Sequence, residues 1–282
     1  MATKGRLILF TVVLCISLGI ARSEKLFAKD KKLKPEEVVA AHLKSIGSPK
    51  ALEAIKSRVI MGTASVVFTQ GAFGNLPDGK SLIVSEGRKL GIVMTYGAHD
   101  YPGEYFASDG DHVTVGYIDF DIRSKLGEFI RQYYGLMSEG LLGGTLSVAW
   151  PLLDVQKRRA KPTCKKRVIE GRQLHELNYN PKSRSGMEGL LIGLFFDLET
   201  FRHVMTEYRY RTLEGYNVTV LKERFDDFRE VDGMMLPHTY TIDYSRTGPT
   251  FIGCWTVKVK QWLHNAPIDP QLFKAQSLRK TN

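Results

Sequence analysis

One stretch of the sequence matches a phosphate-binding loop letter for letter. Residues 74–81 read G-N-L-P-D-G-K-S, which fits the pattern G-x-x-x-x-G-K-[ST]. That chemistry needs a helix directly after the loop, because the N-terminal amides of the helix face the phosphates. The run Leu82-Ile83-Val84 follows instead and is typical of a strand. We therefore expect an exposed hairpin loop at residues 74–81, built from turn-forming residues, and no nucleotide site.

Other groups that could catalyse a reaction or bind a metal lack the necessary spacing. The seven histidines form no H-E-x-x-H or H-x-H sequence, so no metal ligand set is indicated. The pairs Asp109/Asp111 and Asp119/Asp121 are close in sequence, but a glycosidase needs two carboxylates that face each other across a cleft. No G-x-S-x-G elbow is present. We expect a protein that is not an enzyme and has no cofactor and no metal.

The N-terminus has the pattern of a secretory signal. Lys4 and Arg6 precede an apolar run over residues 7–20, and small residues at 21 and 23 define a cleavage site before Glu24. We expect a signal peptide at residues 1–23 and an exported protein, with an uncleaved anchor as the alternative. Beyond the signal, Cys164 and Cys254 remain, and whether they pair is open.

Composition indicates a globular, basic protein. The chain has 282 residues, 43% of them hydrophobic and 25% charged, which excludes disordered, collagen-like and multi-span membrane classes. The formal net charge of +10 favours an anionic membrane surface or an acidic partner. No nucleic-acid recognition motif accompanies it, so we expect no nucleic acid partner.

The elements that must position any site are helices first and then many strands. A lysine-rich spacer (24–35) leads into two helices that begin at Pro35 and Pro49. Strand-like runs follow, with hairpin turns at 109–110, 170–171 and 232–233. Short hairpins make antiparallel pairs, so we predict an α+β fold, mainly antiparallel β, in a single domain over residues 36–274 with a polar tail at 275–282.

A glycine-rich helical segment interrupts the strands. Its apolar residues at 126, 129, 130, 133 and 137 have helical spacing, and the apolar face continues to residue 150. The ordinary interpretation of these side chains is packed core. The alternative is an apolar cavity between sheet and helix, whose candidate lining residues are Phe129, Ile130, Tyr133, Met137, Leu141, Leu142, Leu146 and Trp150.

A basic cluster follows this segment. It comprises Lys157, Arg158, Arg159, Lys161, Lys165, Lys166 and Arg167. Charge runs usually form a solvated surface. The sharper hypothesis is a dock for anionic headgroups or for an acidic partner.

Four segments resemble the LolA/LolB-like lipoprotein-carrier superfamily of bacterial envelopes. They are the opening helices at 35–55, with S-I-G at 45–47, the F-F-D-L-E-T run at 195–200, the late hairpin at 223–237 with its V-D-G-M-M-L-P ending, and the terminal N-A-P-I-D-P-Q-L-F at 265–273. The resemblance spans residues 35–273. The chain departs from a typical carrier in its greater length, its glycine-rich segment at 136–150, and the lack of a lipid-attachment cysteine.

The resemblance implies an incomplete, half-open antiparallel β-barrel with helices on the concave face. It also implies an exported, periplasmic carrier that holds a lipid or the acyl chain of a lipoprotein there without chemistry. We expect this carrier to be a monomer. The alternative is an envelope sensor or interaction module that uses the sheet and the 157–167 cluster to dock an envelope protein or an anionic membrane surface.

Overall fold

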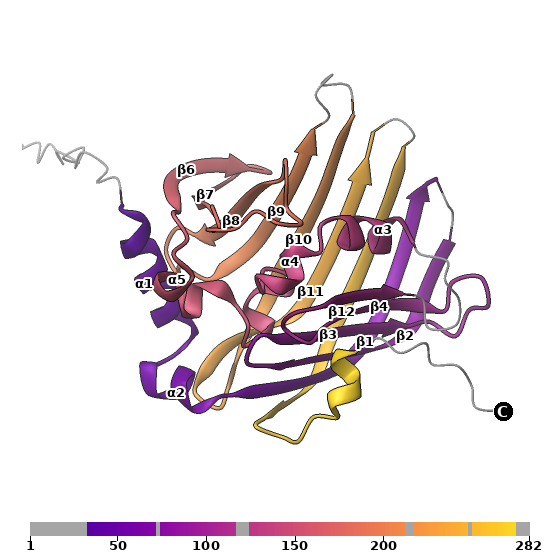
Figure 1. Ribbon diagram of the computed structural model, residues 1–282, viewed down its shortest axis with the longest axis horizontal. Helices are drawn as coiled ribbons and strands as arrows, with labels where there is room; N and C mark the ends of the chain where they lie inside the picture. Colours follow the sequence, from indigo (N-terminus) through magenta and orange to yellow (C-terminus); the bar gives the residue numbers. More distant parts are fainter. Residues whose placement is uncertain (1–32, 72–73, 117–123, 212–216, 248–249, 275–282) are drawn as a thin grey trace, which may run out of the picture. The chain divides into compact units, whose positions relative to one another are not determined.

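The computed structural model describes residues 33–71, 74–116, 124–211, 217–247 and 250–274 (Figure 1). These residues belong to one compact unit that spans Leu33–Asn282. The predicted signal peptide, most of the lysine-rich spacer, the polar tail, and Asp119 and Asp121 lie outside the described residues. No helix within the described ranges combines the length and the apolarity that a membrane crossing requires.

One antiparallel sheet of twelve strands dominates the described residues. Its order is β5-β4-β3-β2-β1-β12-β11-β10-β9-β8-β7-β6. The bounds are β1 (Ser57–Gln70), β2 (Gly74–Glu86), β3 (Lys89–Thr95), β4 (Gly103–Ser108), β5 (Val113–Gly116), β6 (Thr163–Ile169), β7 (Arg172–Asn178), β8 (Leu191–Asp197), β9 (His203–Arg211), β10 (Val218–Val231), β11 (Met234–Arg246) and β12 (Phe251–His264).

The sheet is curved and does not close. Strand β1 pairs with both β2 and β12, so the last strand joins the first five to the remaining six. Strands β5 and β6 form the two edges, which leaves the barrel incomplete. The predicted α+β, mainly antiparallel architecture with a half-open barrel is confirmed.

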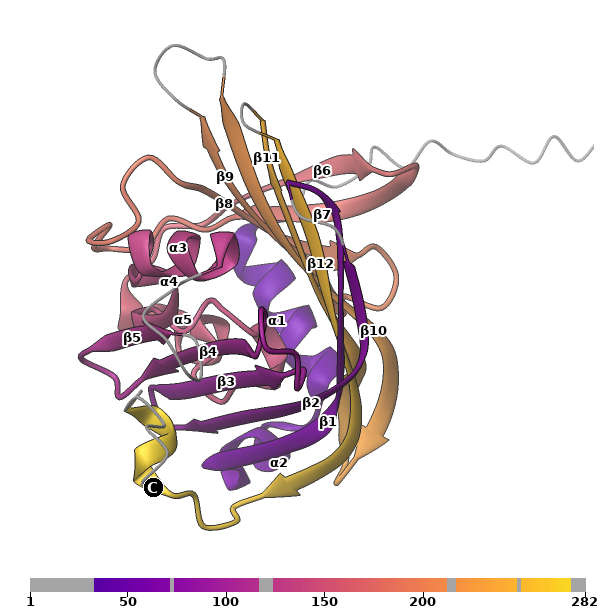
Figure 2. The same ribbon diagram turned by 90° about the vertical axis from the view of Figure 1, so that its right-hand side faces the viewer.

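Five α-helices and three short 3₁₀ helices complete the described residues. They are α1 (Pro35–Ile46), α2 (Pro49–Ala54), α3 (Lys125–Gln132), α4 (Gly135–Ser138), η1 (Gly144–Leu146), η2 (Pro151–Leu153), α5 (Val155–Arg158) and η3 (Pro270–Phe273). Capping fixes where two of them begin: the hydroxyls of Ser48 and Ser124 accept backbone N–H bonds from Ala51 and Gly127 at 3.2 and 2.8 Å. Figure 2 shows α1, α3, α4 and α5 on the inner side of the curved sheet.

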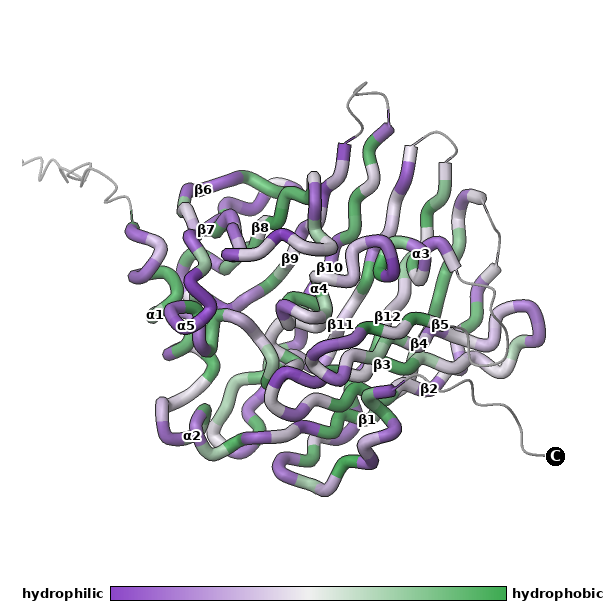
Figure 3. The backbone as a smooth tube through the Cα atoms, in the orientation of Figure 1, coloured by the Kyte–Doolittle hydropathy of each residue, from purple (hydrophilic) through white to green (hydrophobic). Residues whose placement is uncertain are grey.

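The strands alternate between an apolar inner face and a more polar outer face. On β8, Leu194 and Phe196 belong to the main core, whereas Phe195 packs in a small cluster on the other face. This period of two is the pattern that half-buried strands require. Figure 3 shows hydrophobic and hydrophilic residues interleaved along the long strands.

Two expectations about local structure were wrong. Residues 74–81, expected as an exposed hairpin loop, lie in β2 and pair with β1, from Gly74 opposite Phe68 to Ser81 opposite Gly62. A strand, rather than a helix, follows the phosphate-loop pattern. The helical segment also divides: α3 ends at Gln132, α4 is one turn, and residues 139–150 are turns around η1. Cys164 and Cys254 are not joined by a disulfide.

Candidate ligand site on the concave face

A separate segment of the chain covers the concave face. We call residues 124–158 the strap; it contains α3, α4, η1, η2 and α5 and connects the β5 half of the sheet to β6. In Figure 2 the helices of the strap lie inside the curve of the sheet. The strap contributes no strand to the sheet, so its contacts with the inner face are made by side chains and by isolated backbone groups.

All eight candidate lining residues lie in the strap and are buried in one apolar core. That core comprises Phe129, Ile130, Tyr133, Met137, Leu141, Leu142, Leu146 and Trp150 together with inward side chains of the sheet. The ring of Phe129, for example, packs against Tyr133 and Tyr244 at centroid distances of 4.8 and 5.8 Å. The structure therefore brings the eight together, and their side chains fill the concave face.

The strap passes close to the sheet at Gly144. Its backbone has φ +46°, and an added Cβ would lie 2.7 Å from the Phe225 ring and 2.9 Å from the His203 ring. Any larger residue would have to lift the strap or displace both rings. Glycine is thus required here both for the left-handed backbone and for the contact.

A buried carboxylate holds the same turn. Glu223 on β10 is fully buried and accepts the Gly143 backbone N–H at 2.6 Å and the hydroxyls of Tyr208 and Tyr240 at 2.7 and 2.5 Å. Burial raises the pKa of Glu223 to about 7, although these three hydrogen bonds oppose the shift. The carboxylate thus links the strap to two strands, β9 and β11, besides its own.

A second buried carboxylate lies at the start of the strap. Glu104 on β4 is hydrogen-bonded to Ser124, the N-cap of α3, and to the Tyr101 hydroxyl. That hydroxyl in turn accepts the indole N–H of Trp255 at 2.6 Å. Burial raises the pKa of Glu104 to about 7. Both ends of the α3–η1 stretch therefore contact a carboxylate whose charge is disfavoured by burial.

Two histidines contact Trp150 of the strap. The indole N–H of Trp150 donates to Nε2 of His42 at 3.1 Å, so Nδ1 carries the proton and donates to the Phe201 carbonyl at 3.1 Å. The Trp150 ring stacks on His203 at 4.6 Å. Burial lowers the pKa of His42 to about 4 and that of His203 well below its usual value. Both rings are neutral packing partners at pH 7.

A buried arginine supports η1. Arg58 on β1 is 4% exposed, and its Nη1 donates to the Thr145 carbonyl at 2.6 Å. A second, longer contact runs from Nη2 to the Met234 sulfur at 3.7 Å. Burial lowers the pKa of Arg58 to about 10. Among the described residues no carboxylate contacts this guanidinium, although buried charges in proteins are normally paired.

The basic cluster is distributed over several surfaces. Arg158 is 8% exposed at its side chain and anchors the end of the strap through Asp154 and the carbonyls of Glu139 and Ala149. Lys157, Arg159 and Lys161 are exposed.

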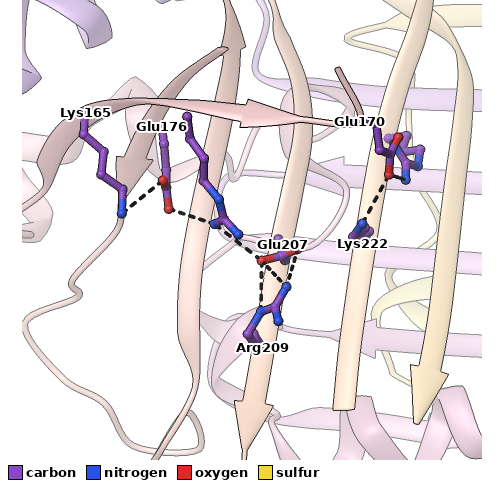
Figure 4. A network of polar contacts seen from close by, with 8 residues as sticks. Lys165, Glu170, Glu176, Glu207, Arg209 and Lys222 are labelled. Carbon is purple, nitrogen blue, oxygen red and sulfur yellow. Dashed lines mark hydrogen bonds and ion pairs between the residues drawn. The ribbon is translucent and has the colours of Figure 1, made fainter. Parts of the chain in front are cut away.

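The remaining members lie on the edge strand β6, on opposite faces. Lys165 and Arg167 share the outer face, where both pair with Glu176 at 3.3 Å, and Arg167 also reaches Glu207 at 3.8 Å. Figure 4 shows this ion-pair chain continuing across the neighbouring strands to Arg209. Lys166 takes the inner-face register, opposite His175. A dock built from all seven residues stays a prediction.

A groove opens beside the strap. It has a volume of about 450 Å³ and lies between α1 and the η2–α5 end of the strap. Val39 and Leu43 line one wall, Leu152 and Val155 the other, and Lys157 also contributes to the lining. The size is within the range of about 300–1,000 Å³ that is typical of small-molecule sites.

The sequence analysis did not identify the polar residues of the site, although the sequence positions of two of them indicate burial. Glu223 stands between Leu221 and Phe225 at a spacing of two, and Arg58 stands two residues before Ile60. A charged residue in the apolar register of a strand indicates a buried charge. Among the residues that the structure describes, no group of three or more His, Cys, Asp or Glu side chains could hold a metal ion.

Comparison with known proteins gives a structural likeness alone. No protein-family model matches the chain, and no curated protein matches it. The crystal structure of a LolA superfamily protein from Nitrosomonas europaea has a TM-score of 0.50 and 13% identity, covering 85% of this chain and 97% of that one. A putative outer membrane lipoprotein-sorting protein domain from Vibrio parahaemolyticus has a TM-score of 0.45 and 11% identity, covering 85% and 97%. The first likeness shows the fold: this chain has the LolA-like fold that its sequence resemblance implied.

Proposed function

We propose that the protein is an exported periplasmic carrier that binds an apolar ligand, a lipid or a lipoprotein acyl chain, on the concave face without catalysing a reaction. The observation that carries the proposal is that a separate strap, rather than the sheet, fills that face with its eight apolar side chains. A strap held by a few polar contacts can be exchanged for a ligand of the same character, whereas a core built by the sheet cannot.

The free energy of such an exchange is the difference between two sets of apolar contacts. Each CH₂ group that leaves water contributes about 0.8 kcal/mol. A ligand that displaces the strap replaces one set of apolar contacts with another. The net affinity is therefore set by the extra chain length that the ligand buries, less the hydrogen bonds that the strap gives up. The fold resemblance supports this location, because it implies that carriers of the superfamily bind acyl chains on the same face.

Native mass spectrometry of the chain from Glu24, exported to a bacterial periplasm, tests the proposal directly. Lipid extraction from the same sample identifies the bound species. A stoichiometric acyl-chain ligand is the expected result. A ligand-free protein that also fails to bind added oleate or oleyl alcohol would refute it.

The apolar groove beside α1 gives a route by which the ligand reaches the strap.

A second candidate is an interaction module. One observation favours it: Val168 on β6 is 64% exposed and adjoins the basic residues of the edge strand. Exposed apolar side chains next to cations suit an acidic protein partner. Reversing the charges of Lys165 and Lys166 would abolish such an association, and an association that is insensitive to salt would argue against it.

A further inference from the structure

Unpartnered polar atoms gather around Arg58. Among the described residues, six buried side-chain nitrogen or oxygen atoms have no hydrogen-bond partner, and four of them belong to Arg58, Thr145, Trp262 and His264. The guanidinium carbon of Arg58 lies 6.0 Å from the Trp262 ring centroid, which lies 6.0 Å from that of His264. Arg58 is also directly opposite His264 on β12. The four residues thus form one polar cluster next to η1 of the strap.

Two of the four unpartnered atoms of this cluster are obligate hydrogen-bond donors. Arg58 Nε and Trp262 Nε1 are donors in every protonation state they adopt in proteins. His264 donates through Nδ1 to Asp232 at 2.7 Å, which leaves Nε2 as the unpartnered ring atom. The Arg58 edge formed by Nε and Nη2 is the fork that matches the two oxygens of a carboxylate or phosphate. In the described residues that edge faces the Met234 sulfur and no oxygen.

We propose that Arg58, with Trp262, binds the anionic head group of the ligand, so that the ligand class is an acyl chain ending in a carboxylate or phosphate. This proposal rests on the proposed function, because the head group reaches the fork when the strap leaves. The Thr145 carbonyl holds the guanidinium in the closed protein. An anion that replaces this neutral oxygen supplies the missing opposite charge, and the bidentate geometry is the strong form of that contact.

The nearby charges agree with an anionic ligand. The Asp232 carboxylate lies near the cluster, where it pairs with His264, and its side chain is mostly exposed. No carboxylate contacts Arg58 among the described residues, and its desolvated guanidinium has a lowered pKa. A head group bound at Arg58 would place its chain along the inner face, towards the core that η1 now occupies.

The test compares three ligands that share the same 18-carbon hydrocarbon chain and differ in their head groups. Native mass spectrometry at pH 8 measures binding of oleate, oleoyl lysophosphatidate and the neutral oleyl alcohol to the full mature chain. We expect the wild type to bind both anions at least about tenfold more tightly than the alcohol. The anion that binds more tightly identifies the source of the ligand, fatty acid or phospholipid. Arg58→Met should reduce that preference to about one, Arg58→Lys should retain part of it, and Trp262→Phe should weaken it while keeping an aromatic ring.

Arg88→Met provides the matched control. Arg88 also donates to a strap carbonyl, that of Ser138 at 2.9 Å, but it is exposed and has no part in the polar cluster. This variant should keep the anion preference. A wild type that binds the alcohol as well as the anions, or an Arg58→Met protein that keeps the preference, would overturn the head-group site and leave the carrier function standing. A wild type that binds none of the three ligands would refute the carrier function itself.

Discussion

The carboxylate of Glu223 lies 2.6 Å from the backbone nitrogen of Gly143, so a buried acid on the sheet holds the turn at the centre of the strap. Burial raises the pKa of this acid to about 7. An acid with a raised pKa contributes stability that is fully present below the unfolded value of 4.5 and is lost as the pH rises through 7. The strap is therefore held less firmly in alkaline solution.

The first prediction is that Glu223→Gln stabilises the protein at pH 8 relative to the wild type and much less at pH 5. One pKa unit corresponds to about 1.4 kcal/mol, so the difference in unfolding free energy grows by a few kcal/mol over this range. Thermal unfolding at several pH values measures it. His42, with its pKa lowered to about 4, acts in the opposite sense and loses its contribution as the pH falls below 6.5. The readout is therefore the difference between variant and wild type, and a pH-independent difference would contradict the assignment.

The second prediction concerns Gly144. Gly144→Ala should lower the melting temperature and increase binding of a neutral apolar dye, because the new Cβ meets Phe225 and His203 and lifts the strap. Gly171→Ala is the control: that residue has φ +79° but an added Cβ would meet no atom within 4 Å. Each substitution bears the cost of a left-handed alanine, about 1–2 kcal/mol. Equal dye binding by the two variants would show that the contact at Gly144 does not keep the strap in place.

The third prediction separates stability from ligand affinity. Leu146→Ala should cost about 2–5 kcal/mol of stability and raise the affinity for oleyl alcohol roughly tenfold, since the strap then competes with less apolar surface. Leu174→Ala removes a buried leucine on the outer face and should lower stability without that gain. Titration calorimetry and chemical unfolding measure the two quantities, and a parallel affinity change in both variants would contradict the competition.

The fourth prediction tests the groove as the entrance. Ala40 is exposed on α1 and lines the groove. Ala40→Trp should slow ligand association several-fold and leave the equilibrium stability nearly unchanged, because it narrows the groove without entering the core. Stopped-flow fluorescence measures the rate, and Lys44→Trp, on the same helix outside the groove lining, is the control. An unchanged rate in Ala40→Trp would exclude this route.

The fold was largely predictable because its signals are local. Alternating apolar residues and the turns at Asp109-Gly110, Glu170-Gly171 and Asp232-Gly233 specify the hairpins, and each of these turns joins two paired strands in the structure. The order of the sheet is then mostly the order of the chain. The boundaries of β2 escaped prediction, since pairing with β1 outweighs the turn propensity of residues 74–81.

The polar part of the site was not predictable at the same level. The contacts of Arg58 with Thr145, and of Glu223 with Gly143, join residues 80 or more positions apart. Periodicity indicates that Glu223 faces inward, but it does not indicate which residue of the strap contacts its carboxylate. The apolar residues of the strap were identified from their spacing, whereas whether they line a cavity or fill it depends on how close the strap comes to the sheet.

Hydrogen exchange of the strap tests the central claim most directly. Exchange of peptides covering residues 136–150 is followed by mass spectrometry, with and without saturating oleate, and peptides from β10 and β11 serve as the reference. The account predicts that ligand binding lowers the protection of the strap, including the Gly143 amide that now bonds to Glu223, while the reference strands keep theirs. Bound ligand with unchanged or increased protection of residues 136–150 would contradict displacement of the strap.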